Sequence, residues 1–126
     1  MAISIRIEGQ PGAPLRFGGS VITLGRAATN DLPLADNRIS GRHGRLLRRG
    51  EGYRYEDLGS RNGSLVERAG QRQVVNPGEP VDVAAGDRLL LGDLHAPVVL
   101  VIEAAPRVAA GGETSGTVVG RRAVTR

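Results

Sequence analysis

Short runs of alternating apolar and polar residues dominate the first hundred positions of the chain. In residues 2–8, isoleucine occupies every second position, a pattern typical of a strand that buries one face. Further short runs of apolar and β-branched residues lie at 15–17, 21–24 and 32–34, on both strands of a central hairpin that ends at residue 58, and at 64–66, 74–75, 81–83, 88–91 and 97–102.

Turn-forming residues separate nearly all of these runs. Glycine, asparagine, aspartate and proline gather at 9–12, 18–19, 76–78, 86–87 and 92–93. No extended window before position 104 places apolar residues at helical spacing without Gly or Pro. The sequence therefore predicts an all-β fold, an antiparallel β-sandwich of about 11 strands with Val, Leu and Ile packed between two sheets.

The composition limits the chemistry that the chain can perform. It has 126 residues, no cysteine and two histidines. Disulfides, thiolate metal sites and cysteine nucleophiles are excluded, and neither histidine is paired with acids at metal-ligand spacing. No paired-carboxylate cleft, nucleophile and base pattern or P-loop is visible. We therefore expect a protein that is not an enzyme and that has no catalytic residue, metal site or cofactor.

The net charge of +4 does not indicate a nucleic-acid-binding surface. Four arginines and a single glutamate follow residue 103, so most of the positive charge lies in the C-terminal segment. One Phe, two Tyr and no Trp are too few for base stacking. The longest apolar run is far shorter than a membrane span, and the N-terminus shows no secretory signal. We expect no nucleic acid and no membrane as partners, and a cytoplasmic location.

The composition changes after residue 103 to Ala, Gly, Thr and Arg. We predict one β-sandwich domain over residues 1–105 and a flexible tail or linker over residues 106–126. Thr114, Thr117 and Thr125 lie in this Gly-rich, Arg-containing segment, a context that suits a basic-directed kinase. Thr114 and Thr117 are therefore candidate phosphorylation sites.

The stretch from residue 38 to residue 62 carries the groups most suited to binding. Two turn-rich segments with hydroxyl, guanidinium and amide side chains flank one predicted hairpin. Because the outgoing and returning strands of a hairpin bring their far ends together, we expect both segments at the same end. Loop arginines with nearby hydroxyls are a recurrent means of binding phosphate. The sequence therefore predicts an anion-binding site that lacks an acid and base pair.

These residues, with others in a fixed order, resemble the forkhead-associated (FHA) domain family. The resemblance runs from about residue 3 to residue 103. Its motifs are Gly25-Arg26 closing a strand, Asn30-Asp31-Leu32, Ser40 and His43 three residues apart, Asp57-Leu58-Gly59-Ser60-Arg61-Asn62-Gly63-Ser64, and Gly86-Asp87-Arg88 before a strand. It implies an FHA/SMAD-like sandwich whose loops at one end bind phosphothreonine peptides.

The resemblance also implies roles for individual residues. Arg26 and Ser40 are expected to contact the phosphate, and Asn62 to hold the main chain of the peptide. The implied phosphopeptide-binding set is Arg26, Ser40, Gly41, Arg42, Arg61 and Asn62. His43 is expected to brace the loops without touching ligand, so that the structural set is Gly25, His43 and Gly63. The family commonly has a basic residue where this chain has Gly41.

Several of these residues have a simpler interpretation. Arg26 is also explained as a solvated arginine at a strand end, and Ser40 as the cap of a turn. Asn62-Gly63 is a common hairpin-turn signal, in which Asn62 would serve only to adopt a positive φ. Three further arginines fit either a solvated strand face or a surface that steers an anionic peptide: Arg45, Arg48 and Arg49.

We therefore predict a non-catalytic signalling adaptor, a monomer as an isolated domain. It would bind a phosphothreonine-containing protein modified by an upstream Ser/Thr protein kinase, or regulate a larger chain of which it is part. Two alternatives remain open. One is a phospho-independent protein-interaction module on the same scaffold, and the other is a self-inhibited switch in which the phosphorylated tail binds its own domain.

Overall fold

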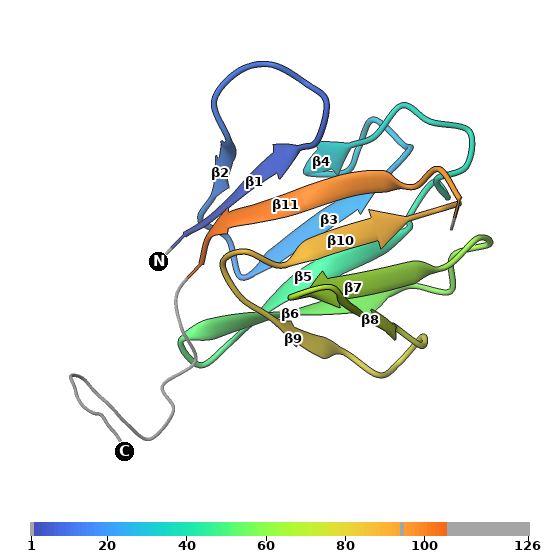
Figure 1. Ribbon diagram of the computed structural model, residues 1–126. Coiled ribbons are helices and arrows are strands. Elements are labelled where there is room, and N and C mark those ends of the chain that lie inside the picture. Colours follow the sequence, from blue (N-terminus) through green and yellow to red (C-terminus); the bar gives the residue numbers. More distant parts are fainter. Residues whose placement is uncertain (1, 94, 106–126) are drawn as a thin grey trace.

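Two β-sheets stack face to face in the computed structural model, which describes residues 2–93 and 95–105 (Figure 1). The predicted tail, with Thr114, Thr117 and Thr125, lies outside the described residues. Among the described residues there is no helix, and hence none of a length and hydrophobicity that would cross a membrane. The predicted all-β sandwich of 11 strands is confirmed.

One sheet contains six strands and the other contains five. The six-stranded sheet has the spatial order β2-β1-β11-β10-β7-β8. Its strands are β1 (Ile3–Ile7), β2 (Leu15–Phe17), β7 (Ser64–Arg68), β8 (Gln71–Val74), β10 (Arg88–Leu91) and β11 (Val98–Ala104). The five-stranded sheet has the order β4-β3-β5-β6-β9. Its strands are β3 (Val21–Gly25), β4 (Leu32–Pro33), β5 (Gly44–Arg49), β6 (Gly52–Asp57) and β9 (Val81–Val83).

Neighbouring strands are antiparallel, with one exception. β3 and β4 pair in parallel through Leu24 with Leu32 and Gly25 with Pro33. β8 begins at Gln71, earlier than the predicted run at 74–75. The sequence pattern did not reveal its first three residues, because they are polar and all four residues of the strand are exposed. Such a strand lies at the edge of a sheet and carries no alternating pattern that a sequence could reveal.

The core between the sheets is aliphatic, with two buried tyrosines that the expected Val, Leu and Ile core did not include. Tyr53 and Tyr55 on β6 are both fully buried. The hydroxyl of Tyr53 donates to Gly19 O at 3.2 Å, and that of Tyr55 lies 2.7 Å from Ser64 Oγ. Burial raises the pKa of Tyr55, so this ring is a neutral hydrogen-bonding part of the core.

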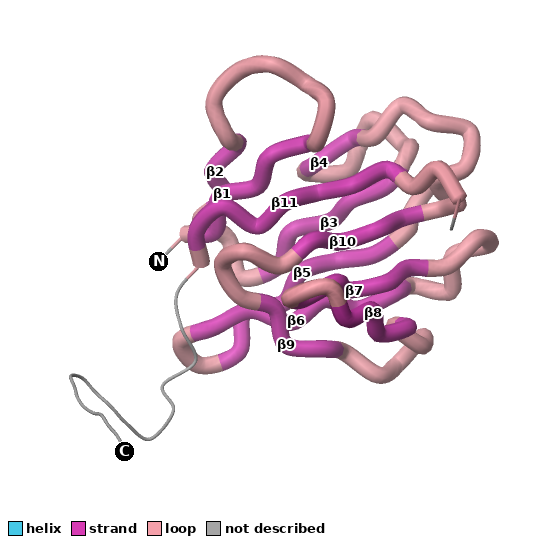
Figure 2. Tube along the Cα trace, viewed as in Figure 1, coloured by secondary structure: helices cyan, strands magenta, loops and turns pink. Residues whose placement is uncertain are grey.

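Several loops gather at one end of the sandwich, on the right in Figure 2, and four of them concern the predicted site. They connect β3 to β4, β4 to β5, β6 to β7 and β10 to β11. β1 begins and β11 ends at the opposite end (Figure 1). The β5–β6 hairpin places the two segments that flank it at the loop end, since Gly44 pairs with Asp57 there. This is the arrangement that the sequence predicted for those segments.

Candidate functional site

Gly25, the last residue of β3, lies directly against the loop between β4 and β5. Arg26 N donates to Ser40 O at 2.9 Å, and His43 N donates to Leu24 O at 3.0 Å. A Cβ atom on Gly25 would overlap the carbonyl group of Gly41 and lie 2.9 Å from His43 N. Packing therefore requires glycine at position 25. The close approach brings the backbone of Arg26 beside Ser40.

His43 is fully buried and joins two of the four loops. Ser40 N donates to its Nδ1 at 3.1 Å, and its Nε2 lies 2.8 Å from Gly63 O. Because Nδ1 accepts a hydrogen bond, the proton of the neutral ring is on Nε2, which donates to Gly63 O. Burial lowers the pKa of His43. The ring is thus a neutral brace between the loop of Ser40 and the loop of Asn62.

Asn30 is a second brace, whose role the sequence did not predict. Its Nδ2 donates to Ala27 O and to Gly41 O, each at 2.8 Å. The side chain is nearly buried, and it adds to the backbone hydrogen bonds that the same two carbonyl groups accept, from Asn30 N to Ala27 O and from Ala27 N to Gly41 O. Asn30 thus fixes the loop that follows Arg26 to the loop that carries Ser40.

Asp57 organises the loop between β6 and β7 from inside the protein. Its carboxylate accepts hydrogen bonds from Gly59 N and Ser60 N at 2.8 Å, from Ser60 Oγ at 2.5 Å and from Ser64 Oγ at 2.7 Å. Burial alone would raise the pKa of Asp57, but these hydrogen bonds outweigh it and the pKa is lowered. The ionised carboxylate therefore fixes the turn that presents Arg61 and Asn62.

Five of the six residues implied to bind the phosphopeptide line one small pocket at the loop end. Its volume is about 120 Å³, and we call it the Arg26 pocket. The implied residues on its wall are Arg26, Ser40, Gly41, Arg61 and Asn62. Arg42 is exposed on the same loop and does not line the pocket. The sequence analysis missed three wall residues: Asn37, Arg38 and Ile39.

The polar groups of Ser40 and Asn62 connect the loops across the pocket. Ser40 Oγ accepts from Arg61 N at 3.0 Å, so its own proton remains available to a ligand. Asn62 Nδ2 donates to Arg38 O at 2.9 Å. Among the described residues, Ala69 is the only non-glycine residue with a positive φ. A positive φ therefore does not account for Asn62.

Arg38 is in an ion pair with Asp36 and is therefore not a free cation. Its Nε and Nη2 donate to the two carboxylate oxygens of Asp36 at 2.9 and 2.7 Å, and its Nη1 donates to Ala96 O. The hydrogen bonds from Arg38 lower the pKa of Asp36 to about 2. This pair could not be predicted from the sequence, since Asp and Arg two residues apart in a loop are common.

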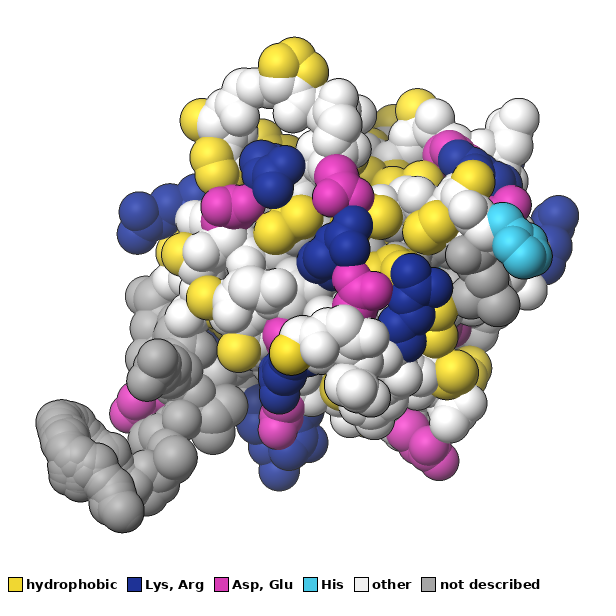
Figure 3. Space-filling view, viewed as in Figure 1, with side chains coloured by type: hydrophobic (Ala, Val, Ile, Leu, Met, Phe, Trp, Pro, Cys, Tyr) yellow, Lys and Arg dark blue, Asp and Glu magenta, His cyan; other side chains and the backbone are white. Residues whose placement is uncertain are grey.

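The remaining arginines divide into paired and unpaired groups. Ion pairs cover much of the outer face of the six-stranded sheet, where basic and acidic side chains alternate (Figure 3). Arg45 pairs with Glu56 on the outer face of the other sheet. Within residues 2–93 and 95–105, six arginines have no ion-pair partner: Arg16, Arg26, Arg42, Arg48, Arg49 and Arg61. Arg26, Arg42 and Arg61 are on the site loops, so unpaired positive charge is concentrated there.

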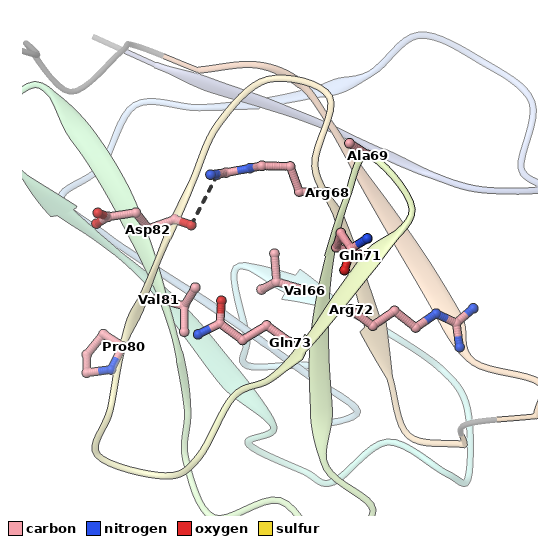
Figure 4. Close-up of a pocket in the computed structure, with 9 residues that line it drawn as sticks. All are labelled: Val66, Arg68, Ala69, Gln71, Arg72, Gln73, Pro80, Val81 and Asp82. Atoms are coloured by element: carbon pink, nitrogen blue, oxygen red, sulfur yellow. Dashed lines mark hydrogen bonds between the residues drawn. The ribbon is translucent and has the colours of Figure 1, made fainter.

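A larger pocket, of about 660 Å³, lies between the edge strands β8 and β9 (Figure 4). Val66 and Val81 contribute apolar surface, and Arg68 Nη2 reaches across to Asp82 O at 3.5 Å. Both of its arginines are in ion pairs, Arg68 with Asp87 and Arg72 with Glu67. The smaller Arg26 pocket, whose Arg26 and Arg61 are unpaired, is therefore the better anion site.

Comparison with known proteins identifies the family. The sequence profile of the FHA domain matches residues 22–92. FhaB of Mycolicibacterium smegmatis, an FHA domain-containing protein, is 41% identical over 58 residues, which are 46% of this chain and 37% of FhaB. Protein phosphatase 2C 70 of Arabidopsis thaliana is 32% identical over 80 residues, covering 56% of this chain and 13% of the phosphatase. The chain thus spans well under half the length of these curated relatives.

Solved structures show the same fold. The FHA domain of a hypothetical protein from Arabidopsis thaliana has a TM-score of 0.70 and 24% identity, covering 87% of this chain and 91% of that one. EmbR of Mycobacterium tuberculosis, solved in complex with a low-affinity phosphopeptide, has a TM-score of 0.68 and 19% identity, covering 86% of this chain and 26% of that one. The profile match spans more than half of the sequence and includes every residue of the Arg26 pocket. The chain therefore belongs to the FHA domain family.

Proposed function

We propose that this domain binds phosphothreonine peptides at the Arg26 pocket and serves as a non-catalytic signalling adaptor. The observation that carries the proposal is the concentration of unpaired arginines around a small polar pocket that also holds a hydroxyl and an amide. The EmbR structure, a relative of the same fold, contains a phosphopeptide.

The polar groups of the pocket match a phosphate dianion. In the proposal, the guanidinium group of Arg26 and the hydroxyl of Ser40 donate to the phosphate oxygens, as charge-assisted hydrogen bonds. Arg61 and Arg42 add positive charge at the rim, and the loop backbone at Gly41 approaches the ligand without a side chain. Arginine stays charged at all physiological pH values, so the positive charge of the pocket does not depend on pH in that range.

Asn62 is proposed to hold the main chain of the peptide. One N–H of its amide is used by Arg38 O, which fixes the orientation of the side chain. The other N–H and the amide oxygen remain for an extended peptide, whose main chain offers both an acceptor and a donor.

The proposed partner is a protein carrying a phosphothreonine made by an upstream Ser/Thr protein kinase. The domain would act as a monomer in the cytoplasm. The edge strand β8 supports this, since its first three residues are polar and a polar edge disfavours pairing with another sheet.

Isothermal titration calorimetry with matched peptides tests the proposed function. One peptide sequence is prepared with threonine, phosphothreonine or glutamate at the central position. We expect measurable affinity only for the phosphothreonine form, because glutamate lacks the third oxygen and the second charge of the phosphate. Equal affinity for the threonine and phosphothreonine forms would instead identify a phospho-independent interaction module.

A further inference from the structure

Asn62 and Gly63 also line a second, larger pocket on the side of the loop that faces β8. Its volume is about 310 Å³, and its outer wall consists of Leu65, Val74 and Pro77. We call it the Val74 pocket. Asn62 belongs to both this pocket and the Arg26 pocket. A peptide held at Asn62 therefore has direct access to both.

The exposure of Val74 is unusual for this protein. Its side chain is 61% exposed, more than the other two exposed large aliphatic side chains of the described residues, Leu15 and Val21. The three residues before it on β8 are all polar, as expected for an edge strand. Of these three exposed side chains, Val74 is the one that lines a pocket shared with the site loops.

The side chains of Asp57, Ser60 and Ser64 in the Val74 pocket already have hydrogen-bond partners within the protein. The carboxylate of Asp57 accepts four hydrogen bonds from its own loop and from Ser64, and the hydroxyl of Ser64 also contacts Tyr55. Ser60 Oγ donates to Asp57 and accepts from Gly63 N at 3.1 Å. These groups present no missing partner to a ligand. At these three side chains, an apolar occupant therefore costs no hydrogen bond, whereas a charged one gains none.

The walls of the Val74 pocket are fixed by backbone hydrogen bonds. Val75 N donates to Ser64 O at 3.0 Å, which ties the end of β8 to the start of β7. Pro77 lies in a turn that Glu79 N closes onto Asn76 O at 3.0 Å. A pocket that exists before binding loses little freedom when it is filled. Its volume is at the lower end for sites that hold small organic molecules, which is ample for one aliphatic side chain.

A third pocket also includes Asn62 and has a different character. It holds Arg38, Gly92, Asp93 and His95, with a volume of about 270 Å³. We call it the His95 pocket. Charged and titratable side chains line it, whereas the surface of the Val74 pocket is mainly apolar. The two pockets beside Asn62 therefore present different chemistry to a bound peptide.

We propose that the Val74 pocket receives an aliphatic side chain of the phosphothreonine peptide and thereby selects among phosphorylated partners. This inference rests on the proposed function, because the phosphate is what places the peptide across Asn62. The occupant is a leucine, isoleucine or valine of the same peptide, and the apolar surface of Val74 that solvent now contacts becomes buried on binding.

A leucine scan tests the proposal. Phosphothreonine peptides of alanine carry a single leucine at each position on either side of the phosphothreonine in turn, and their affinities are compared with that of the all-alanine phosphopeptide. We expect one position at which leucine strengthens binding about 3- to 10-fold, the range for burying part of an aliphatic side chain. Val74→Asp should abolish that gain and leave the affinity for the all-alanine phosphopeptide nearly unchanged.

Two controls make the scan specific. Val21→Asp places the same change on a valine at the start of β3, away from the site loops, and should retain the gain from leucine. A gain that is abolished by His95→Ala and retained in Val74→Asp would assign the leucine to the His95 pocket and overturn the proposal. If phosphopeptides bind but leucine strengthens binding at no position, the proposal for the Val74 pocket is wrong and the proposed function still stands. The absence of binding by any phosphopeptide would refute both.

Discussion

Replacing His43 tests whether the binding loops depend on a single buried brace. In His43→Ala, Ser40 N and Gly63 O each lose the partner that the imidazole provides. An unsatisfied, largely buried polar group costs about 1–3 kcal/mol, which applies to Ser40 N, whereas Gly63 O keeps the hydrogen bond from Gly92 N at 3.1 Å. The cavity left by the fully buried ring adds to this cost. A typical domain is stable by only about 5–15 kcal/mol. We therefore expect His43→Ala to lose a large share of its free energy of unfolding.

Two conservative variants divide this loss between the two hydrogen bonds. His43→Asn can place an oxygen near the position of Nδ1 and keep the bond from Ser40 N, but its side chain is too short to reach Gly63 O. His43→Gln can place an N–H near the position of Nε2. Each variant should retain part of the stability that His43→Ala loses. Urea unfolding followed by circular dichroism measures the three free energies.

The same variants should also bind phosphopeptide less tightly, because the loop of Ser40 and the loop of Asn62 are no longer held together. Leu46→Ala is the control for stability alone, since Leu46 is fully buried on β5 and its truncation costs about 2–5 kcal/mol. At a temperature where all variants are folded, Leu46→Ala should keep wild-type affinity. If folded His43→Ala also binds with wild-type affinity, the histidine does not position the site and our reasoning is wrong.

Four further outcomes follow from the structure. Arg26→Ala should lose about 1.5–3 kcal/mol of phosphopeptide binding, roughly tenfold to over a hundredfold in affinity, whereas Arg48→Ala, which removes an exposed unpaired arginine elsewhere, should bind normally in calorimetry. Gly25→Ala should unfold at markedly lower urea, because its Cβ would overlap the Gly41 carbonyl; wild-type stability would show that the loop moves aside. Phosphothreonine should bind more tightly than phosphoserine by up to about 0.8 kcal/mol, the free energy of burying one methyl-sized group; equal affinities would show that the site does not bury the methyl group. Finally, burial lowers the pKa of His43 below 6.5, so the unfolded chain binds the proton more readily and stability should fall as the pH drops below about 6.5; in His43→Gln this part of the pH dependence should disappear from urea unfolding curves.

Much of the fold was predictable because the buried face of a strand repeats every second residue. The isoleucines of β1 show this directly, since Ile3 and Ile5 are fully buried. β8 does not follow the pattern, because a strand whose four residues are all exposed has no buried face to reveal it. The parallel pairing of β3 with β4 could not be predicted from the sequence either. A strand of two residues is too short to show an alternating pattern, and only its pairing with β3 defines it.

The site was predictable to the extent that its residues form short motifs. The order of the Gly25, Ser40, His43 and Asn62 motifs was enough to bring five implied binding residues to one pocket. The bonds of Asn30 to Gly41 O, and of Asn62 to Arg38 O, join residues that are distant in sequence and carry no local signal. The role of Asp57 did have a local signal, because an aspartate shortly before Gly and Ser commonly accepts hydrogen bonds from their N–H groups in a turn.

The neutral state of the buried His43 ring bears on how recognition varies with acidity. The cations of the proposed site are arginines, which do not lose their charge at any physiological pH. The imidazole that aligns them has its pKa lowered by burial and contributes no charge near neutrality. The phosphate is then the group whose charge changes, since its second proton binds with a pKa near 6. Between mildly acidic and neutral conditions, the ligand and not the receptor should determine how affinity changes.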